Sequence, residues 1–233
     1  MIFWRRFRWR FGALLALFLM SPAGGISLWT DDWQVVSHEP DLTIYARMKD
    51  GQELKDFRGV LRLRAPLRQV VTMLLDANAM PQWFYRMKEA RILDSNGSDE
   101  SHIYMVIKGK LTVSDRDAVV DVKINQDSKT QVITINAVAK PDYYPTMPDR
   151  VRIPRMEFRW TVTPLSPKET EVRLDGQLDM GGHISPWAAN LVVEQLPRQT
   201  LRHLRQRIKA QREIPALDEH YKNAILKFPE TSP

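Results

Sequence analysis

Several stretches of this 233-residue chain alternate between apolar and polar side chains, and this pattern constrains the fold more than any other feature. The clearest stretch places Val172, Leu174 and Leu178 on one face, with charged or amide side chains between them. Further strands are predicted at residues 57–64, 117–125, 158–163, 42–48, 88–93, 101–108 and 130–139. A period of two is typical of antiparallel strands that bury one face. Asn96-Gly97 predicts a tight hairpin between two of them.

Helical spacing of apolar residues is confined to two main segments. The first follows Pro66, which suits the start of a helix, and the second is predicted from Pro186 to Arg212 with a kink at Pro197. Short helical turns are predicted near 29–36 and 77–84. Two helices cover about eight strands only if the sheet curls. The predicted fold is therefore α+β, with a bent antiparallel sheet wrapped around the last helix and a cavity between them.

The first 25 residues read as a signal peptide. A basic segment, MIFWRRFRWR, precedes an apolar run, FGALLALFLM, and then a small-residue segment, SPAGG. Cleavage is expected after about Gly25 or Ser27, so the protein is expected to be exported, to the periplasm in a bacterium. The alternative is an uncleaved membrane anchor, although the apolar run is about half of the ~20 residues that a spanning helix needs.

The formal net charge of +6 is unevenly distributed. The predicted leader holds four of the 34 basic residues and no acid, which leaves 30 basic against 28 acidic residues. Six of those 30 lie on the last predicted helix, at Arg198, Arg202, Arg205, Arg207, Lys209 and Arg212. A basic helix face of this kind suits transient contact with an anionic membrane surface through Arg198, Arg202, Arg205 and Lys209, or is simply solvated. Because the leader predicts export, we expect no nucleic-acid partner.

Recognisable catalytic patterns are missing from the sequence. The five histidines have no metal-ligand spacing, and the absence of cysteine excludes disulfides, thiolate catalysis and cysteine-based zinc sites. There is no nucleophile elbow, phosphate loop or dinucleotide fingerprint. We therefore expect no enzymatic activity, no cofactor and no metal, and we expect a monomer.

A series of local sequences then coincides in order and spacing: Leu42-Thr43-Ile44-Tyr45-Ala46-Arg47, Asp76-Ala77-Asn78-Ala79-Met80-Pro81-Gln82-Trp83, Ser114-Asp115-Arg116-Asp117, Val151-Arg152-Ile153-Pro154 and Gly181-Gly182-His183-Ile184-Ser185-Pro186. Together they resemble the START family, the StAR-related lipid-transfer domains of the helix-grip, or Bet v 1-like, superfamily. The resemblance covers residues 29–212 and leaves 213–233 as a C-terminal extension.

This resemblance implies a curved sheet and a C-terminal lid helix that enclose a tunnel for one lipid or similar apolar molecule. Binding, and transfer of the ligand between membranes, is the expected function. One alternative is a polyketide cyclase or aromatase that uses the same cavity, because the superfamily includes such enzymes. Another is a scaffold or stress protein whose cavity has collapsed, which a structure without an internal tunnel would favour.

The candidate residues for lining the tunnel are Met73, Trp83, Tyr104, Arg116, Arg152, Trp160, Trp187 and Leu191. Alternation places Arg116 on the apolar face, as an anchor for a ligand head group or as half of a structural ion pair. Arg152 could reach the tunnel mouth or be a solvated loop charge, and the aromatic and methionine side chains could be plain core. Gly181 and Gly182 are a candidate lid hinge, or only a tight turn.

Overall fold

The computed structural model describes residues 32–97, 99–109, 113–214, 216–217, 219–221 and 228. The predicted signal peptide, residues 1–25, lies outside the described residues. Within them, no helix is long and apolar enough to cross a membrane.

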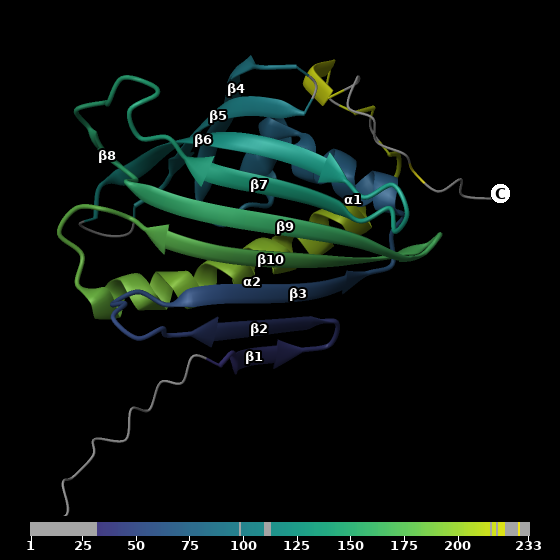
Figure 1. The fold of residues 1–233 in the computed structure, drawn as a ribbon, viewed down its shortest axis with the longest axis horizontal. Helices are drawn as coiled ribbons and strands as arrows, with labels where there is room; N and C mark the ends of the chain where they lie inside the picture. Colours follow the sequence, from purple (N-terminus) through teal and green to yellow (C-terminus); the bar gives the residue numbers. More distant parts are fainter. Residues whose placement is uncertain are drawn as a thin grey trace, which may run out of the picture.

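One ten-stranded sheet contains every predicted strand (Figure 1). The strands are β1 Gln34–Glu39, β2 Leu42–Arg47, β3 Asp56–Leu63, β4 Met87–Ser95, β5 Glu100–Ile107, β6 Asp115–Gln126, β7 Ile133–Ala139, β8 Arg150–Arg152, β9 Arg155–Ser166 and β10 Glu169–Asp179. Their order across the sheet is β1-β2-β3-β10-β9-β7-β6-β5-β4, and the short β8 pairs with β6 in parallel. All other pairings are antiparallel, as the period-two alternation predicts.

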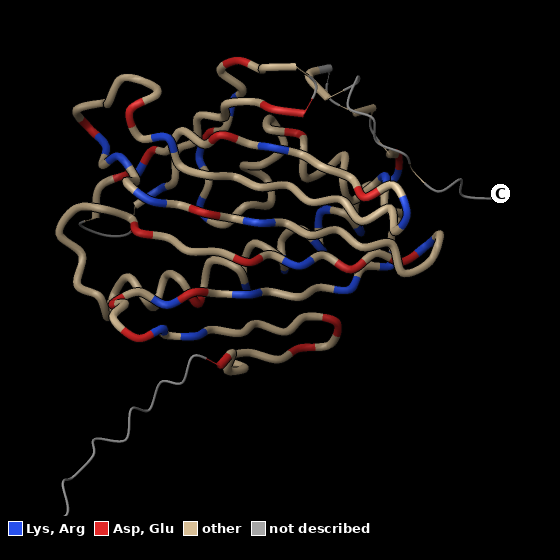
Figure 2. Tube along the Cα trace, in the orientation of Figure 1, with Lys and Arg blue, Asp and Glu red and all other residues tan. Residues whose placement is uncertain are grey.

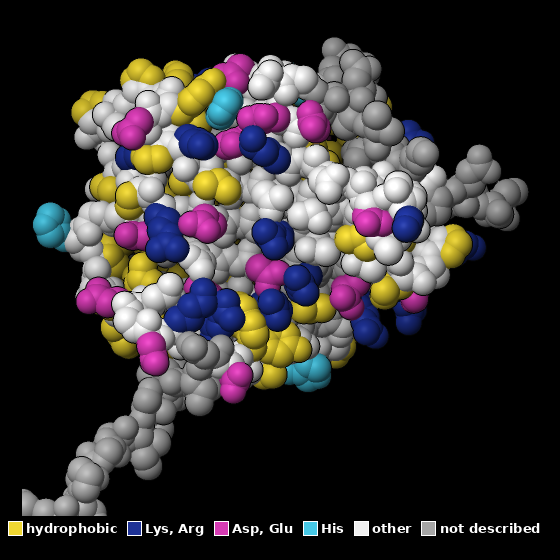
Figure 3. Space-filling model, in the orientation of Figure 1, with side chains coloured by type: hydrophobic (Ala, Val, Ile, Leu, Met, Phe, Trp, Pro, Cys, Tyr) yellow, Lys and Arg dark blue, Asp and Glu magenta, His cyan; other side chains and the backbone are white. Residues whose placement is uncertain are grey.

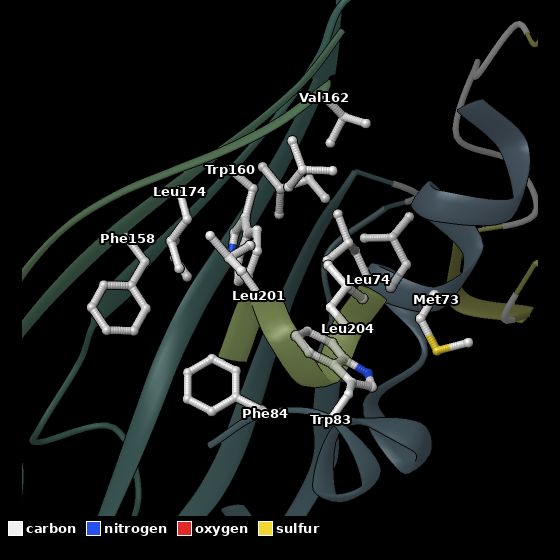
Figure 4. Packing of buried hydrophobic residues seen from close by; sticks show 14 of the residues in the cluster. Met73, Leu74, Trp83, Phe84, Phe158, Trp160, Val162, Leu174, Leu201 and Leu204 are labelled. Atoms are coloured by element: carbon white, nitrogen blue, oxygen red, sulfur yellow. The ribbon is translucent and has the colours of Figure 1, made fainter. Parts of the chain in front are cut away.

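Two α-helices cover the inner face of this sheet. They are α1, Leu67–Leu75, and α2, Pro186–Ala210, and α2 runs behind the strands in Figure 1. Gly59 on β3 lets α2 approach closely, because a Cβ at this position would collide with the side chain of Leu201. The close-up in Figure 4 shows Leu201 and Leu204 of α2 among side chains that project from the sheet. The main hydrophobic core therefore lies between the inner face and the helices.

The outer face of the sheet is polar. Lysines and arginines alternate with acids along its strands, and both signs are interspersed on the face shown in Figures 2 and 3. The pairs run across neighbouring strands: Arg58 Nε lies 2.5 Å from Asp175 Oδ1, and Arg62 Nε lies 3.3 Å from Glu171 Oε2. This two-sided pattern is what a half-buried sheet requires.

Several local predictions need correction. The helical turn predicted at 29–36 is wrong from Gln34 onward, because β1 begins there; residues 29–31 lie outside the described residues. The turn predicted at 77–84 is confirmed as a 3-10 helix, η1, Ala77–Gln82. α2 ends at Ala210, two residues before the predicted end at Arg212, and it contains the buried Pro197, where a kink stays a prediction. A further 3-10 turn, η2, Glu219–Tyr221, follows α2.

Candidate functional site

A cavity of about 40 Å³ lies in the core between α1, η1 and the inner face of the sheet. Its lining is apolar or aromatic and consists of Leu74, Leu75, Met80, Trp83, Phe84, Met87, Ile103, Met105, Val120, Val122, Ile135, Ala137, Met156, Phe158, Trp160 and Tyr221. Pockets that hold small-molecule ligands usually measure roughly 300–1,000 Å³. The cavity is therefore much smaller than the tunnel that the family resemblance implies.

Trp83 and Trp160 are the two predicted residues that lie in this lining. Their ring centroids are 5.9 Å apart and the rings meet nearly edge to face, with Trp160 on β9 and Trp83 directly after η1 (Figure 4). Asp76 holds η1 in place, since its Oδ1 accepts a hydrogen bond from the backbone nitrogen of Ala79 at 3.0 Å. Among the described residues, the buried indole nitrogen of Trp83 has no hydrogen-bond partner. Whether either ring contacts a ligand stays a prediction.

Arg116 lies at the start of β6 with its side chain on the inner face, as the alternation predicts. The residue is 5% exposed, and one of its terminal nitrogens donates to the backbone oxygen of Ser114. The other terminal nitrogen lies beneath Gly182, 3.7 Å from where a Cβ on that glycine would be. Ala118, two residues further along β6, is opposite Met105 of the cavity lining. The guanidinium therefore sits beyond one end of the cavity.

The ion-pair interpretation of Arg116 does not hold within the described part of the chain. No described acid lies within salt-bridge distance of it, and its Nε is buried without a partner. The neighbouring Asp115 is engaged elsewhere, by the Lys88 ammonium at 3.1 Å and the Gly109 backbone nitrogen at 2.9 Å. Burial lowers the pKa of Arg116, and the charge of Asp115 opposes this effect. Arginine nevertheless stays charged in proteins, so this is a buried cation.

Arg152 and Tyr104 do not line the cavity, which corrects both predictions. Parallel pairing of β8 with β6 sets Arg152 opposite Asp117 on the outer face. Its Nε and one terminal nitrogen each lie 3.0 Å from an oxygen of Asp117, and it also donates to backbone oxygens of the β7–β8 loop. The Tyr104 hydroxyl donates to the same carboxylate at 3.2 Å and accepts from Arg150 at 2.9 Å. Burial and the Asp117 charge raise the pKa of Tyr104, against the opposing effect of Arg150.

The three remaining lining candidates also lie elsewhere. Met73 is buried in the core on α1, but it is not part of the cavity lining. Trp187 and Leu191 are 74% and 41% exposed, so these two predictions are wrong. Both belong to the first turns of α2, and neither faces the sheet because the helix buries Ala189 and Val193 instead.

Gly181 and Gly182 form the turn that leads into α2, and both have a positive φ, +62° and +71°. Ordinary side chains rarely adopt this conformation, which explains why glycine stands at both positions. A Cβ on Gly181 would also lie 2.9 Å from Pro154 Cδ. The tight turn is therefore a structural fact, and hinge motion stays a prediction.

The basic face of α2 is largely engaged by one acid. Arg198, Arg202 and Arg205 approach the Glu39 carboxylate to 3.2, 3.1 and 3.6 Å. Burial alone would raise the pKa of Glu39, but the hydrogen bonds and charges of Arg198 and Arg202 outweigh it and lower that pKa. Three cations share one anion, so this face keeps a positive charge while it holds α2 to the end of β1. Lys209 is exposed near the end of the helix.

Sequence reasoning missed several lining residues. The lining holds four methionines, Met80, Met87, Met105 and Met156, and sequence reasoning did not consider Met80 or Met87. Period-two alternation on β5 would have placed Ile103 and Met105 inward and Tyr104 outward. Tyr221 carries no such signal, since it lies in the C-terminal extension. In the described residues, no group of three histidines and acids lies close enough together to hold a metal ion.

Comparisons with known proteins agree with this architecture. Residues 25–214 match the START domain family. A fragment of the STAR-related lipid transfer protein of Xanthomonas axonopodis, whose crystal structure is solved, is 32% identical with a TM-score of 0.70, over 76% of this chain and 98% of that one. An uncharacterised protein of Pseudomonas aeruginosa is 27% identical over 175 residues, or 75% of this chain and 86% of its own length.

The human StAR-related lipid transfer protein 5 is 16% identical and shares the fold, with a TM-score of 0.69 over 76% of this chain and 86% of that one. The predicted α+β helix-grip architecture, a curved antiparallel sheet with a long C-terminal helix, is therefore confirmed. Since the family match spans most of the sequence, the chain belongs to the START domain family.

Proposed function

We propose that this protein binds a lipid, or a similar apolar ligand with an anionic group, in the apolar interior between the curved sheet and the helices that cover it, and carries it between membranes. Arg116 is the observation that carries this proposal. Its guanidinium is buried at the end of an apolar interior, and no described acid pairs with it. An unpaired buried charge is costly, so a ligand carboxylate or phosphate would supply the missing partner.

The interior has to expand to admit such a ligand, because its cavity measures only about 40 Å³. Methionine side chains are flexible and adapt to varied shapes, and four of them line the cavity. Burying about 400 Å² of apolar ligand surface would contribute roughly 10 kcal/mol before association costs. That free energy would offset the cost of rearranging the interior. The rearrangement would include movement of α2 about Gly181 and Gly182.

Passive binding without catalysis is supported by the chemistry of the described lining, which consists of aliphatic, thioether and aromatic side chains. A cyclase-like enzyme would need an acid or base directed at its substrate.

We also propose export through the leader at 1–25, and transient membrane contact through α2. Three arginines on one carboxylate keep α2 positively charged, and Trp187 and Leu191 expose apolar surface at its other end.

A scaffold with a filled interior is the second candidate, and the small cavity favours it. Native mass spectrometry of the protein purified from its own host, with extraction of bound lipid, separates the two candidates. Lipid binding predicts a co-purifying anionic lipid, and uptake from phosphatidylglycerol vesicles after delipidation. A protein that carries no apolar ligand and takes none from vesicles would be the scaffold.

The role of Arg116 is tested with Arg116→Met, using Arg62→Met as the matched control because Arg62 lies exposed on the outer face. The Arg116 variant should lose at least tenfold in its preference for phosphatidylglycerol over phosphatidylcholine, since charged hydrogen bonds contribute about 1.5–3 kcal/mol. The control should keep the preference. Unchanged selectivity in Arg116→Met would show that the head group is held elsewhere.

A further inference from the structure

The C-terminal extension supplies one wall of the cavity. Tyr221 belongs to η2, beyond both the end of α2 and the residues 25–214 that match the family. Its side chain is 1% exposed and contributes to the cavity lining. Its hydroxyl lies 2.7 Å from the hydroxyl of Ser101 on β5, and that residue is completely buried. A residue outside the family match therefore reaches into the buried interior of the protein.

Neighbouring residues hold this segment against the body of the protein. Leu217 and Phe228, on either side of Tyr221 in the sequence, are partly buried and pack against the main core. The Phe228 ring lies 6.0 Å from the guanidinium carbon of Arg68, on α1. The extension is thus attached on both sides of the tyrosine that it inserts.

Tyr221 and Arg116 lie at opposite ends of the interior. In the antiparallel pairing of β5 with β6, Ser101 lies opposite Val122 near one end, and Ile107 lies opposite Arg116 at the other end. Ser101 and Ile107 are six residues apart, which is roughly 20 Å along a strand. The inward side chains between them are apolar, at Ile103 and Met105 on β5 and at Ala118 and Val120 on β6. An apolar path of about this length therefore separates the guanidinium from the paired hydroxyls.

We propose that Tyr221 is the end stop of the ligand cavity and limits the length of the acyl chain that the protein accepts. This inference rests on the proposed function, with the anionic group at Arg116 and the chain directed toward η2. The tyrosine ring occupies the space into which a longer chain would extend. Its hydrogen bond to Ser101 keeps the ring in that space. The extension would then determine specificity, independently of the fold that the family match describes.

The test compares wild-type protein with Tyr221→Ala in uptake of phosphatidylglycerols whose acyl chains lengthen two carbons at a time. Wild type should reach a maximum and bind longer lipids more weakly. Tyr221→Ala should move the maximum to longer chains, with roughly tenfold tighter binding for each two-carbon step that the new space accommodates. Tyr143→Ala is the matched control, because Tyr143 is 47% exposed on the outer face, and it should leave the maximum unchanged.

Tyr221→Phe provides a second, milder variant that keeps the ring and loses only the hydroxyl contact with Ser101. It should retain the wild-type maximum, with a broader selectivity as the ring becomes less fixed. If wild type and Tyr221→Ala bind lipid with the same chain-length maximum, the end-stop role is wrong while the proposed function stands. If neither of them takes up any lipid of the series, the proposed function fails and the end-stop role fails with it.

Discussion

Arg116 on β6 and Arg152 on the neighbouring β8 are both largely shielded from solvent, with Arg116 5% exposed and the Arg152 side chain 9% exposed, yet their hydrogen-bond partners differ. Arg152, on the outer face, meets both oxygens of Asp117 and several backbone carbonyls. Arg116, on the inner face, has one backbone acceptor and an Nε without any described partner. Burial alone therefore does not separate these two arginines. The unsatisfied hydrogen-bonding capacity of Arg116 does, and the proposed binding role rests on it.

The largest effect should come from breaking the outer pair. Asp117→Ala leaves the Arg152 guanidinium buried without its anion, which is expected to cost about 3–5 kcal/mol of unfolding free energy. Urea unfolding measures this loss. Glu171→Ala removes the acid from the more exposed pair with Arg62 and should cost less than about 1 kcal/mol. Equal losses in both variants would show that the burial of Asp117 is energetically unimportant.

A smaller effect is expected at the turn between the two arginines. A Cβ added at Gly181 would lie 3.1 Å from the Arg152 backbone oxygen, and one added at Gly182 would lie 3.7 Å from a terminal nitrogen of Arg116. Gly181→Ala should cost more than the roughly 1–2 kcal/mol of a left-handed residue, since the added Cβ also meets Pro154. Gly51 also has a positive φ, +76°, but no atom lies near its added Cβ, so Gly51→Ala measures only the free-energy cost of the backbone conformation. Thermal unfolding of both variants gives the comparison, and a cheaper Gly181→Ala would contradict the close packing of this turn.

A third arginine environment, the cluster around Glu39, predicts a dependence on pH. The pKa of Glu39 is lowered in the folded protein, so its contribution is complete above the unfolded pKa of about 4.3 and is lost as pH falls through the folded pKa. Glu39→Gln should be less stable than wild type by about 1 kcal/mol at neutral pH. The two proteins should converge in acid. A constant difference across the titration would exclude a charge effect.

The smallest stability effect should come from Arg116 itself. Arg116→Met replaces an unpaired buried cation with an apolar side chain, so the unfolding free energy should stay within about 1 kcal/mol of wild type or rise. Urea unfolding of delipidated protein measures this, and Arg152→Met is the matched comparison that should be strongly destabilised. If Arg116→Met unfolds as readily as Arg152→Met, Arg116 is a structural residue and the contrast between the two arginines disappears.

Alternation along the sequence was sufficient to predict the sheet and to place Arg116 on its inner face. Tyr104 and Arg152 were misplaced for another reason: the β7–β8 loop covers the outer side of β5 and β6 as well, so a buried side chain there need not face the cavity. The helical spacing of apolar residues predicted α2, but it did not predict that Trp187 is exposed, because the spacing does not show where the sheet ends. Tyr221 was missed for a different reason: its burial depends wholly on contacts made after the chain folds back.

The strand order also determines how this protein can fold. β3 lies beside β10, with Leu61 opposite Val172, so residues from early and late in the chain meet in the middle of the sheet. The edge of β3 that pairs with β10 stays open until almost the whole domain has been synthesised, and α2 follows later still. Pairings this distant in sequence fold slowly, on a scale of roughly milliseconds to seconds. A chain cut before β10 would therefore leave two incomplete sheets with exposed edges, which are prone to aggregate.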